Sequence, residues 1–308
     1  MKNFYRHLHP LSKIGVIALV ATISLLVFWL LSFVLVIPIF GKDVFSDLIA
    51  GKITFDETNI GLLKFLQLAQ SIGLFVVPSI ILAYLFGGEI DTYLHLDRKP
   101  WATSVLLSVL VIFAASPLIN QLGIWNSEMS LPHWLSSIEK WMRESEDAAE
   151  KLTTLFVQAN SIKALLFNVL LIGIIPAIGE ELLFRGIIQR VFTEWTGNKH
   201  LGIWITAILF SGLHFQFYGF IPRAILGAMF GYLLIYSGNL WLPVIAHFVN
   251  NTAAVLAYYF YNKGVIQFDP DTIGTNAGNG IAAIISVFVV LLLLFYYYKF
   301  ENRKRLEI

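Results

Sequence analysis

Long apolar stretches separated by short polar connections dominate the chain. A helix needs about 20 mostly apolar residues to cross the hydrocarbon core of a bilayer. This pattern predicts an all-α fold, a polytopic membrane helix bundle of about eight transmembrane helices, with residues 1–308 as a single membrane domain. The predicted spans cover approximately residues 14–40, 60–86, 101–123, 164–192, 201–218, 220–237, 240–261 and 280–298.

Composition agrees with a multi-pass protein of the cell membrane. Hydrophobic residues make up 57% of the chain and charged residues 13%, with a mean hydropathy of +0.73, whereas soluble domains carry about 25% charged residues. The net charge of +1 suggests no nucleic-acid partner. The chain has no cysteine, which excludes disulfides, thiolate metal ligands and cysteine nucleophiles. The first apolar stretch is too long for the apolar core of a cleavable signal peptide.

The distribution of charge predicts the orientation in the membrane. An even number of spans places both termini on one side, and lysines and arginines gather at both termini and in the longer loops of that side. Positive charge favours the cytoplasm, so we expect both termini to be cytoplasmic. The segment 124–161 then becomes an extracytoplasmic amphipathic segment. Its Trp134, Ile138 and Trp141 recur at helical spacing, which is typical of a helix resting on the outer leaflet. Nothing in the sequence supports a substrate-gating role for it.

Two adjacent carboxylates, Glu180 and Glu181, directly follow an apolar run, with Arg185 shortly after them. Ionisable groups at membrane depth cost roughly 2.5–3.5 kcal/mol each on insertion, so they are usually functional or paired. Glu181 and Arg185 are four residues apart and share one helical face, which predicts an ion pair. Glu180 is turned by about 100° from that face. The spacing therefore predicts that Glu180 acts as a general base and Glu181 positions Arg185.

Two further polar pairs at helical spacing lie in later spans. Phe210 and His214 belong to the fifth predicted span, and His247 and Asn251 to the seventh. Each of these residues could by itself be a buried structural group. Taken together with the glutamates they suit hydrolysis, because a carboxylate can activate water and an asparagine amide or a histidine can stabilise an oxyanion. Ser211 shows no sign of activation as a nucleophile. The other histidines lie in loops or at span edges, namely His7, His9, His95, His133 and His200.

The ordered motifs Glu-Glu-x-x-x-Arg, Phe-x-x-x-His and His-x-x-x-Asn resemble those of the type II CAAX prenyl endopeptidase family, also called the CPBP or Abi family. The resemblance covers roughly residues 162–262, the expected catalytic core, and includes the stretch from Ser237 to His247. It implies an intramembrane endopeptidase with a conical cavity. It also implies that Glu180 activates water, that His214 and Asn251 bind the oxyanion, and that His247 helps hold the water.

The same residues leave open a zinc-dependent version of this protease, with His214, His247 and a glutamate as ligands. We favour the metal-free glutamic type, with no cofactor, because the His-Glu-x-x-His pair is absent. A shared site also requires Glu180 and His214 to lie at one depth. The fourth helix is therefore expected to continue past Glu181 to about Phe192, with a bend at Pro176.

Two other functions remain open at this point, a non-catalytic protein of the bacteriocin-immunity type and a proton-coupled transporter. A transporter is expected to show repeat symmetry between its halves, and the motifs have no counterpart in residues 1–150. The expected partners are membrane lipid and a peptide or protein substrate with a hydrophobic or lipidated segment. The sequence does not indicate an oligomeric state.

Overall fold

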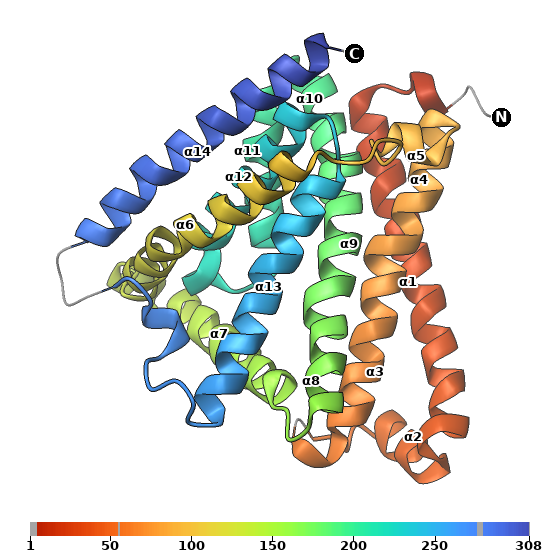
Figure 1. Ribbon diagram of the computed structural model, residues 1–308. Coiled ribbons are helices and arrows are strands. Elements are labelled where there is room, and N and C mark those ends of the chain that lie inside the picture. Colours follow the sequence, from red (N-terminus) through yellow and green to blue (C-terminus); the bar gives the residue numbers. More distant parts are fainter. Residues whose placement is uncertain (1–4, 55, 276–279, 308) are drawn as a thin grey trace.

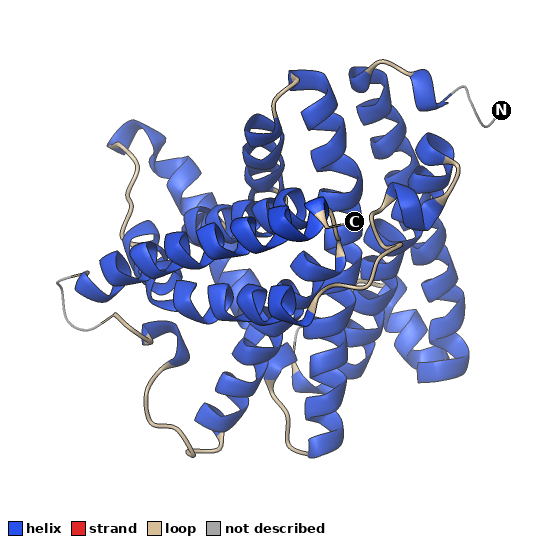
Figure 2. Cartoon of the chain, turned by 45° about the horizontal axis from the view of Figure 1, so that its top comes forward, coloured by secondary structure: helices blue, strands red, loops and turns tan. Residues whose placement is uncertain are grey.

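The computed structural model describes residues 5–54, 56–275 and 280–307. These residues form helices joined by loops and turns, with no strand among them, which Figure 1 shows along the bundle and Figure 2 from a tilted view. The prediction of an all-α bundle is confirmed. Six helices in the described part are long and apolar enough to cross a membrane, namely Pro10–Phe40, Glu57–Gly87, Ala102–Ser127, Ile162–Thr196, Phe217–Ser237 and Ile281–Leu306.

The first two long helices pack side by side at one edge of the bundle (Figure 1). They are α1 (Pro10–Phe40) and a helix made of α3 (Ile60–Ser71), the π-helical segment η3 (Ile72–Val76) and α4 (Val77–Gly87). Buried Lys64 in α3 donates a hydrogen bond of 2.6 Å to Asn168 Oδ1, at the start of the long helix that carries the glutamates. That contact explains how a lysine is accommodated within an apolar span.

The helix that carries the glutamates is the longest in the bundle. It joins α8 (Ile162–Asn168), η5 (Val169–Ile174), α9 (Ile175–Glu181), η6 (Leu182–Ile188) and α10 (Gln189–Thr196) over 35 residues. The predicted continuation past Glu181 is confirmed. The π-helical segment η5 ends just before Pro176, as η3 ends just before Pro78. Proline removes one backbone donor, and a π-helical turn is one way a helix accommodates the change.

A helical hairpin follows this long helix. Gly197 ends α10 in the left-handed conformation, and the Asn198 side chain caps α11 (Lys199–Gly212) by accepting two backbone N–H bonds. The expected fifth span 201–218 was wrong in its last third, because α11 ends at Gly212. Its 14 residues reach about 21 Å, short of a 30 Å core. The chain then turns through η7 (Phe217–Gly219) and returns as α12 (Phe220–Ser237).

The turn between α11 and α12 is held from several sides. Ser211 Oγ donates 2.7 Å to the Phe220 carbonyl, and Asn126 Nδ2 donates 3.0 Å to the Phe217 carbonyl. Phe215 has a positive φ of 54°, which a regular helix does not allow. These contacts replace the helical hydrogen bonds that a continued α11 would have made, and they place His214 in the turn.

Three more helices complete the bundle. The helix α13 (Trp241–Asn262) packs against η5 and α9, and on its other side against α6 (Ala102–Ser127). The last helix, α14 (Ile281–Leu306), lies obliquely beside α6 (Figure 1). α1 begins and α14 ends at the same end of the bundle (Figure 1). Short elements fill the connections, namely η1 (Tyr5–His7), α2 (Lys42–Ile49), η2 (Glu57–Asn59), α5 (Ile90–Tyr93), η4 (His133–Leu135) and η8 (Pro270–Thr272).

The amphipathic segment forms α7 (Ser136–Val157), as its spacing predicts. It does not rest on lipid alone, because it packs against η7. The Trp141 and Phe217 ring centroids lie 5.1 Å apart, and Glu146 accepts the Tyr218 backbone N–H at 2.9 Å. Within α7, hydrogen bonds from Arg143 and from the Leu131 backbone N–H lower the pKa of Glu139. α7 thus fastens the turn that carries His214.

Candidate active site

The hairpin of α10 and α11 brings Glu180 and His214 to one depth. Glu180 precedes Gly197 by as many residues as His214 follows it. In an antiparallel hairpin, residues equally far from the turn lie opposite each other. Phe184 and Phe210 obey the same rule, and their ring centroids are 5.0 Å apart in an edge-to-face contact. The motif residues of the fourth and fifth predicted spans are therefore brought together by chain geometry.

Glu181 lies at the centre of a buried polar cluster. Its Oε1 is 2.9 Å from Arg185 Nη1 and 2.9 Å from His247 Nδ1, and the Glu181 side chain is fully buried. The predicted Glu181–Arg185 ion pair is confirmed, and the bond to His247 is an addition that sequence spacing did not indicate. Because a carboxylate accepts, Nδ1 of His247 carries the hydrogen. A neutral His247 then presents a free lone pair at Nε2.

Two glycines of α12 leave room for the side chains of Arg185 and Gln189 and accept hydrogen bonds from them. Arg185 Nη2 donates 2.9 Å to the Gly227 carbonyl, and Gln189, one turn later, donates 3.4 Å to the Gly231 carbonyl. A Cβ at Gly231 would lie 2.7 Å from Gln189 Oε1 and 2.9 Å from Ile203 Cγ2, so these side chains would have to shift to admit it. The Arg185 guanidinium also lies over the Phe210 ring at 4.6 Å. The Gly227–Gly231 spacing allows close helix packing, and here it also admits the buried side chains of Arg185 and Gln189.

Glu180 faces the other way, as its offset from Glu181 predicts. Its side chain is 13% exposed and lies on a cavity of about 500 Å³. Its Oε2 lies 3.9 Å from His247 Nε2, and no arginine or lysine comes within ion-pair distance of it among the described residues. His247 thus stands between the two glutamates, with one ring nitrogen toward each. Its ring is held by stacking on Phe230 at 5.0 Å.

His214 is oriented by the residue one turn before it. Its Nδ1 lies 2.7 Å from the Phe210 carbonyl oxygen, and the two rings meet edge to face at 5.0 Å. A carbonyl only accepts, so Nδ1 carries the hydrogen. Nε2 of His214 then accepts a hydrogen bond in the neutral ring and donates one only in the protonated ring. The Phe-x-x-x-His spacing is therefore a device that fixes the ring.

Asn251 is oriented by the long helix. Its Nδ2 donates 3.0 Å to the Ile172 carbonyl, and its Oδ1 accepts from Asn250 at 3.1 Å. In a regular α-helix the Ile172 carbonyl would accept from residue 176, which is a proline and has no N–H. The helix interruption thus supplies the acceptor that holds this amide. Asn251 keeps a second N–H, which can serve a ligand in the cavity.

One cavity collects these groups. Sequence reasoning missed four of its polar residues as part of the site, namely Gln67, Thr153, Arg223 and Asn250. A lone arginine inside the apolar stretch 220–237 was the available signal. Thr153 and Phe156 of α7 also line the cavity. Its polar side chains are Gln67, Thr153, Glu180, His214, Arg223, His247, Asn250 and Asn251.

The arrangement does not resemble a metal centre. Zinc requires three or four ligands that converge on one point. Within the described ranges, no group of three or more His, Cys, Asp or Glu side chains is placed to hold a metal ion. His247 has already committed one nitrogen to Glu181.

The fold and this cavity define a helical, multi-pass membrane protein with a carboxylate, histidine and asparagine site among its helices. Residues 162–253 match the Rce1-like family, described as type II CAAX prenyl endopeptidase Rce1-like. The matched region contains all seven motif residues and corresponds to the resemblance drawn from the sequence. It covers the helices from α8 to most of α13.

Two curated relatives are uncharacterized. YpbD of Bacillus subtilis (strain 168) is 33% identical over 93 residues, which cover 29% of this chain and 42% of YpbD. A 24.3 kDa protein of Escherichia coli is 34% identical over 112 residues, covering 35% of this chain and 52% of that protein. The chain thus spans about half the length of the curated relatives it matches. No solved structure matches it.

Proposed function

We propose that this protein is an intramembrane endopeptidase that hydrolyses a peptide bond near a hydrophobic or lipidated segment, with residues 162–262 as its catalytic core. One observation carries the proposal. Glu180, His214, His247 and Asn251 line a single cavity, and no arginine or lysine among the described residues lies within ion-pair distance of Glu180. The family match over residues 162–253 supports the same reaction class.

The proposed reaction begins with water held between Glu180 and Nε2 of His247. Glu180 takes one proton as the water oxygen attacks the peptide carbonyl carbon, and the carbonyl becomes a tetrahedral oxyanion. When the C–N bond breaks, the proton on Glu180 passes to the leaving amine. A positioned general base contributes typically 10²–10⁴-fold to such a step. Glu181 and Arg185 serve by holding His247, not by touching the substrate.

Asn251 is the oxyanion donor in this proposal, through the N–H that Ile172 leaves free. His214 assists only when its ring is protonated, since its Nδ1 hydrogen is committed to the Phe210 carbonyl. An oxyanion donor that is already oriented costs no reorganisation when the charge develops. Both residues are therefore assigned to charge stabilisation, and Glu180 to proton transfer.

The decisive assay is cleavage by purified protein in detergent. The substrates are matched peptides with one apolar segment, with and without a prenylated C-terminal Cys-a-a-X sequence. We expect Glu180→Gln to abolish cleavage and Glu144→Gln, a carboxylate change on exposed α7, to leave it unchanged. A chelator is expected to leave cleavage intact. If the chelator abolishes cleavage and added zinc restores it, the metal-dependent protease is favoured. If the folded wild-type protein cleaves none of the peptides, a non-catalytic protein is favoured.

We further propose that both termini are cytoplasmic and that α7 is extracytoplasmic. The chain has no cysteine, so single introduced cysteines can be labelled without background. Lys304→Cys is expected to resist an impermeant maleimide in intact cells, and Glu144→Cys to react. The reverse labelling would invert the topology without affecting the assignment of the site.

A further inference from the structure

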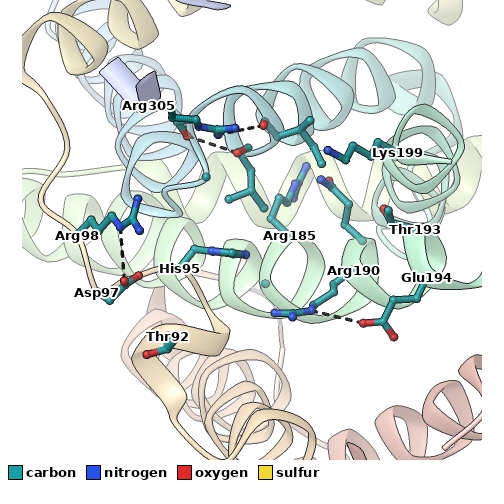
Figure 3. A pocket seen from close by; sticks show the side chains of 16 residues that line it. Thr92, His95, Asp97, Arg98, Arg185, Arg190, Thr193, Glu194, Lys199 and Arg305 are labelled. Atoms are coloured by element: carbon teal, nitrogen blue, oxygen red, sulfur yellow. Dashed lines mark hydrogen bonds and ion pairs between the residues drawn. The ribbon is translucent and has the colours of Figure 1, made fainter. Parts of the chain in front are cut away.

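A second cavity, of about 680 Å³, lies at the end of the bundle where α1 begins and α14 ends. The loop between α5 and α6, the helix α10, the start of α11, the end of α12 and the last turn of α14 all contribute to it. Figure 3 shows His95 and Lys199 reaching inward from opposite sides, with Arg305 above them. None of the residues assigned to proton transfer or oxyanion binding lines this cavity.

Five cationic side chains line this cavity, against two carboxylates, Asp97 and Glu194. Arg98 has its neighbour Asp97 at 3.7 Å, and Arg190 has Glu194 at 3.5 Å. The buried Arg185 is paired with Glu181. Within the described part of the chain, Lys199, Arg305 and His95 have no carboxylate within ion-pair distance. The cationic lining consists of Arg98, Arg185, Arg190, Lys199 and Arg305.

One hydrogen-bond donor on the inner wall of the cavity has no acceptor among the described residues. Arg185 is 1% exposed, and its Nε has no hydrogen-bond partner among the described residues. Thr193 Oγ1, on the same wall, is also without a partner there. Buried polar atoms normally find a partner in the protein, in ordered water or in a ligand.

We propose that this cavity binds a phosphate-bearing anion. Phosphate offers several acceptor oxygens to cations that converge from different elements, and arginine forks match its geometry. The position favours the headgroup of an anionic phospholipid, because basic pockets between membrane helices at the surface of the bilayer bind such headgroups. A soluble phosphate has the same chemistry, and the experiment separates the two sources.

The test uses the full chain in detergent. Retention of phosphatidylglycerol and of phosphatidylcholine is measured by native mass spectrometry, and binding of inorganic phosphate by the thermal unfolding midpoint at constant ionic strength. We expect phosphatidylglycerol to bind in preference. Lys199→Gln with Arg305→Gln is expected to weaken phosphatidylglycerol binding at least about 10-fold, because each change removes a charge-assisted contact. Binding of inorganic phosphate with the same variant dependence would assign the site to a soluble phosphate.

The matched control is Arg303→Gln, which lies on the same turn of α14, outside the cavity, with Glu307 at 3.7 Å. It is expected to change binding less than about 2-fold. The single variants Lys199→Gln and Arg305→Gln replace the double variant if that chain does not fold. Equal binding by the cavity variants, the control and wild type would overturn the proposal, as would no binding of either probe by wild type. Arg185 is left unchanged because it also holds Glu181.

Discussion

The polar side chains of the two cavities of this protein differ in how they are held. In the cavity of Glu180, the ring of His214, the ring of His247 and the amide of Asn251 are each fixed by a hydrogen bond to the protein. In the cationic cavity, long side chains of one charge converge from several elements, and Lys199 and Arg305 have no carboxylate partner among the described residues. Fixed orientation suits chemistry at one point, whereas converging charge suits recognition of an anion. Arg185 lines the cationic cavity and is linked to the cavity of Glu180 only through Glu181, which holds His247.

After Glu180→Gln, the largest loss of cleavage is expected from Asn251→Ala. This change removes the proposed oxyanion donor, and loss of one such donor costs roughly 10²–10³-fold in kcat. Phosphatidylglycerol retention at the cationic cavity should be unchanged, because Asn251 does not line it. Measuring kcat and lipid retention on one preparation checks both halves. A normal kcat would remove Asn251 from the oxyanion site.

Arg185→Lys is the substitution expected to disturb both cavities. Arg185 bonds to Glu181 and to the Gly227 carbonyl from different nitrogens, and lysine cannot reproduce that fork. We expect a loss of about 1–3 kcal/mol in stability, the cost of an unmet buried polar group, with reduced cleavage and weaker lipid retention. The control is Arg303→Lys at the exposed end of α14. Loss of cleavage alone would show that the second cavity does not depend on Arg185.

Gly231→Ala tests the close packing behind both cavities. The added Cβ would lie 2.7 Å from Gln189 Oε1 and 2.9 Å from Ile203 Cγ2, and overpacking costs typically 1–3 kcal/mol. The matched control is Gly15→Ala in α1, where a Cβ would meet nothing within 4 Å. Thermal unfolding in detergent compares the two. Equal midpoints would show that α12 can move away from the long helix at no cost.

The smallest effect on catalysis is expected from Lys199→Gln. Lys199 lies in the lining of the cationic cavity and contacts neither glutamate. Cleavage should change less than about 2-fold while lipid retention falls. A large loss of cleavage at unchanged stability would mean that occupancy of the second cavity controls the first.

Local spacing in the sequence predicts what depends on one helix. The apolar stretches place most of the helices within a few residues, and the spacing of Glu181 and Arg185 gives their ion pair. The equal distance of Glu180 and His214 from Gly197 was also present in the sequence, but it becomes informative only when the turn and the helix before it are known.

Contacts between distant helices could not be predicted in this way. The bond of His247 to Glu181 depends on how α13 packs against α9, and the bond of Asn251 to Ile172 depends on an interrupted helix. The early end of α11 was missed because apolar residues continue through Phe215 and Phe217, and hydropathy cannot distinguish a helix from a turn that neighbours hold. The cationic cavity combines residues from distant loops and helix ends, which no single motif marks.

The central claim is that the adjacent glutamates do different work, and the comparison of Glu180→Gln with Glu181→Gln tests it most directly. Cleavage rate and thermal unfolding are measured for both variants in one detergent. Glu180→Gln is predicted to lower kcat by roughly 10²–10⁴-fold at a nearly unchanged unfolding midpoint. Glu181→Gln is predicted to lower the stability by about 3–5 kcal/mol, because it leaves Arg185 buried without its counter-charge. Full cleavage by a folded Glu180→Gln protein would contradict the account.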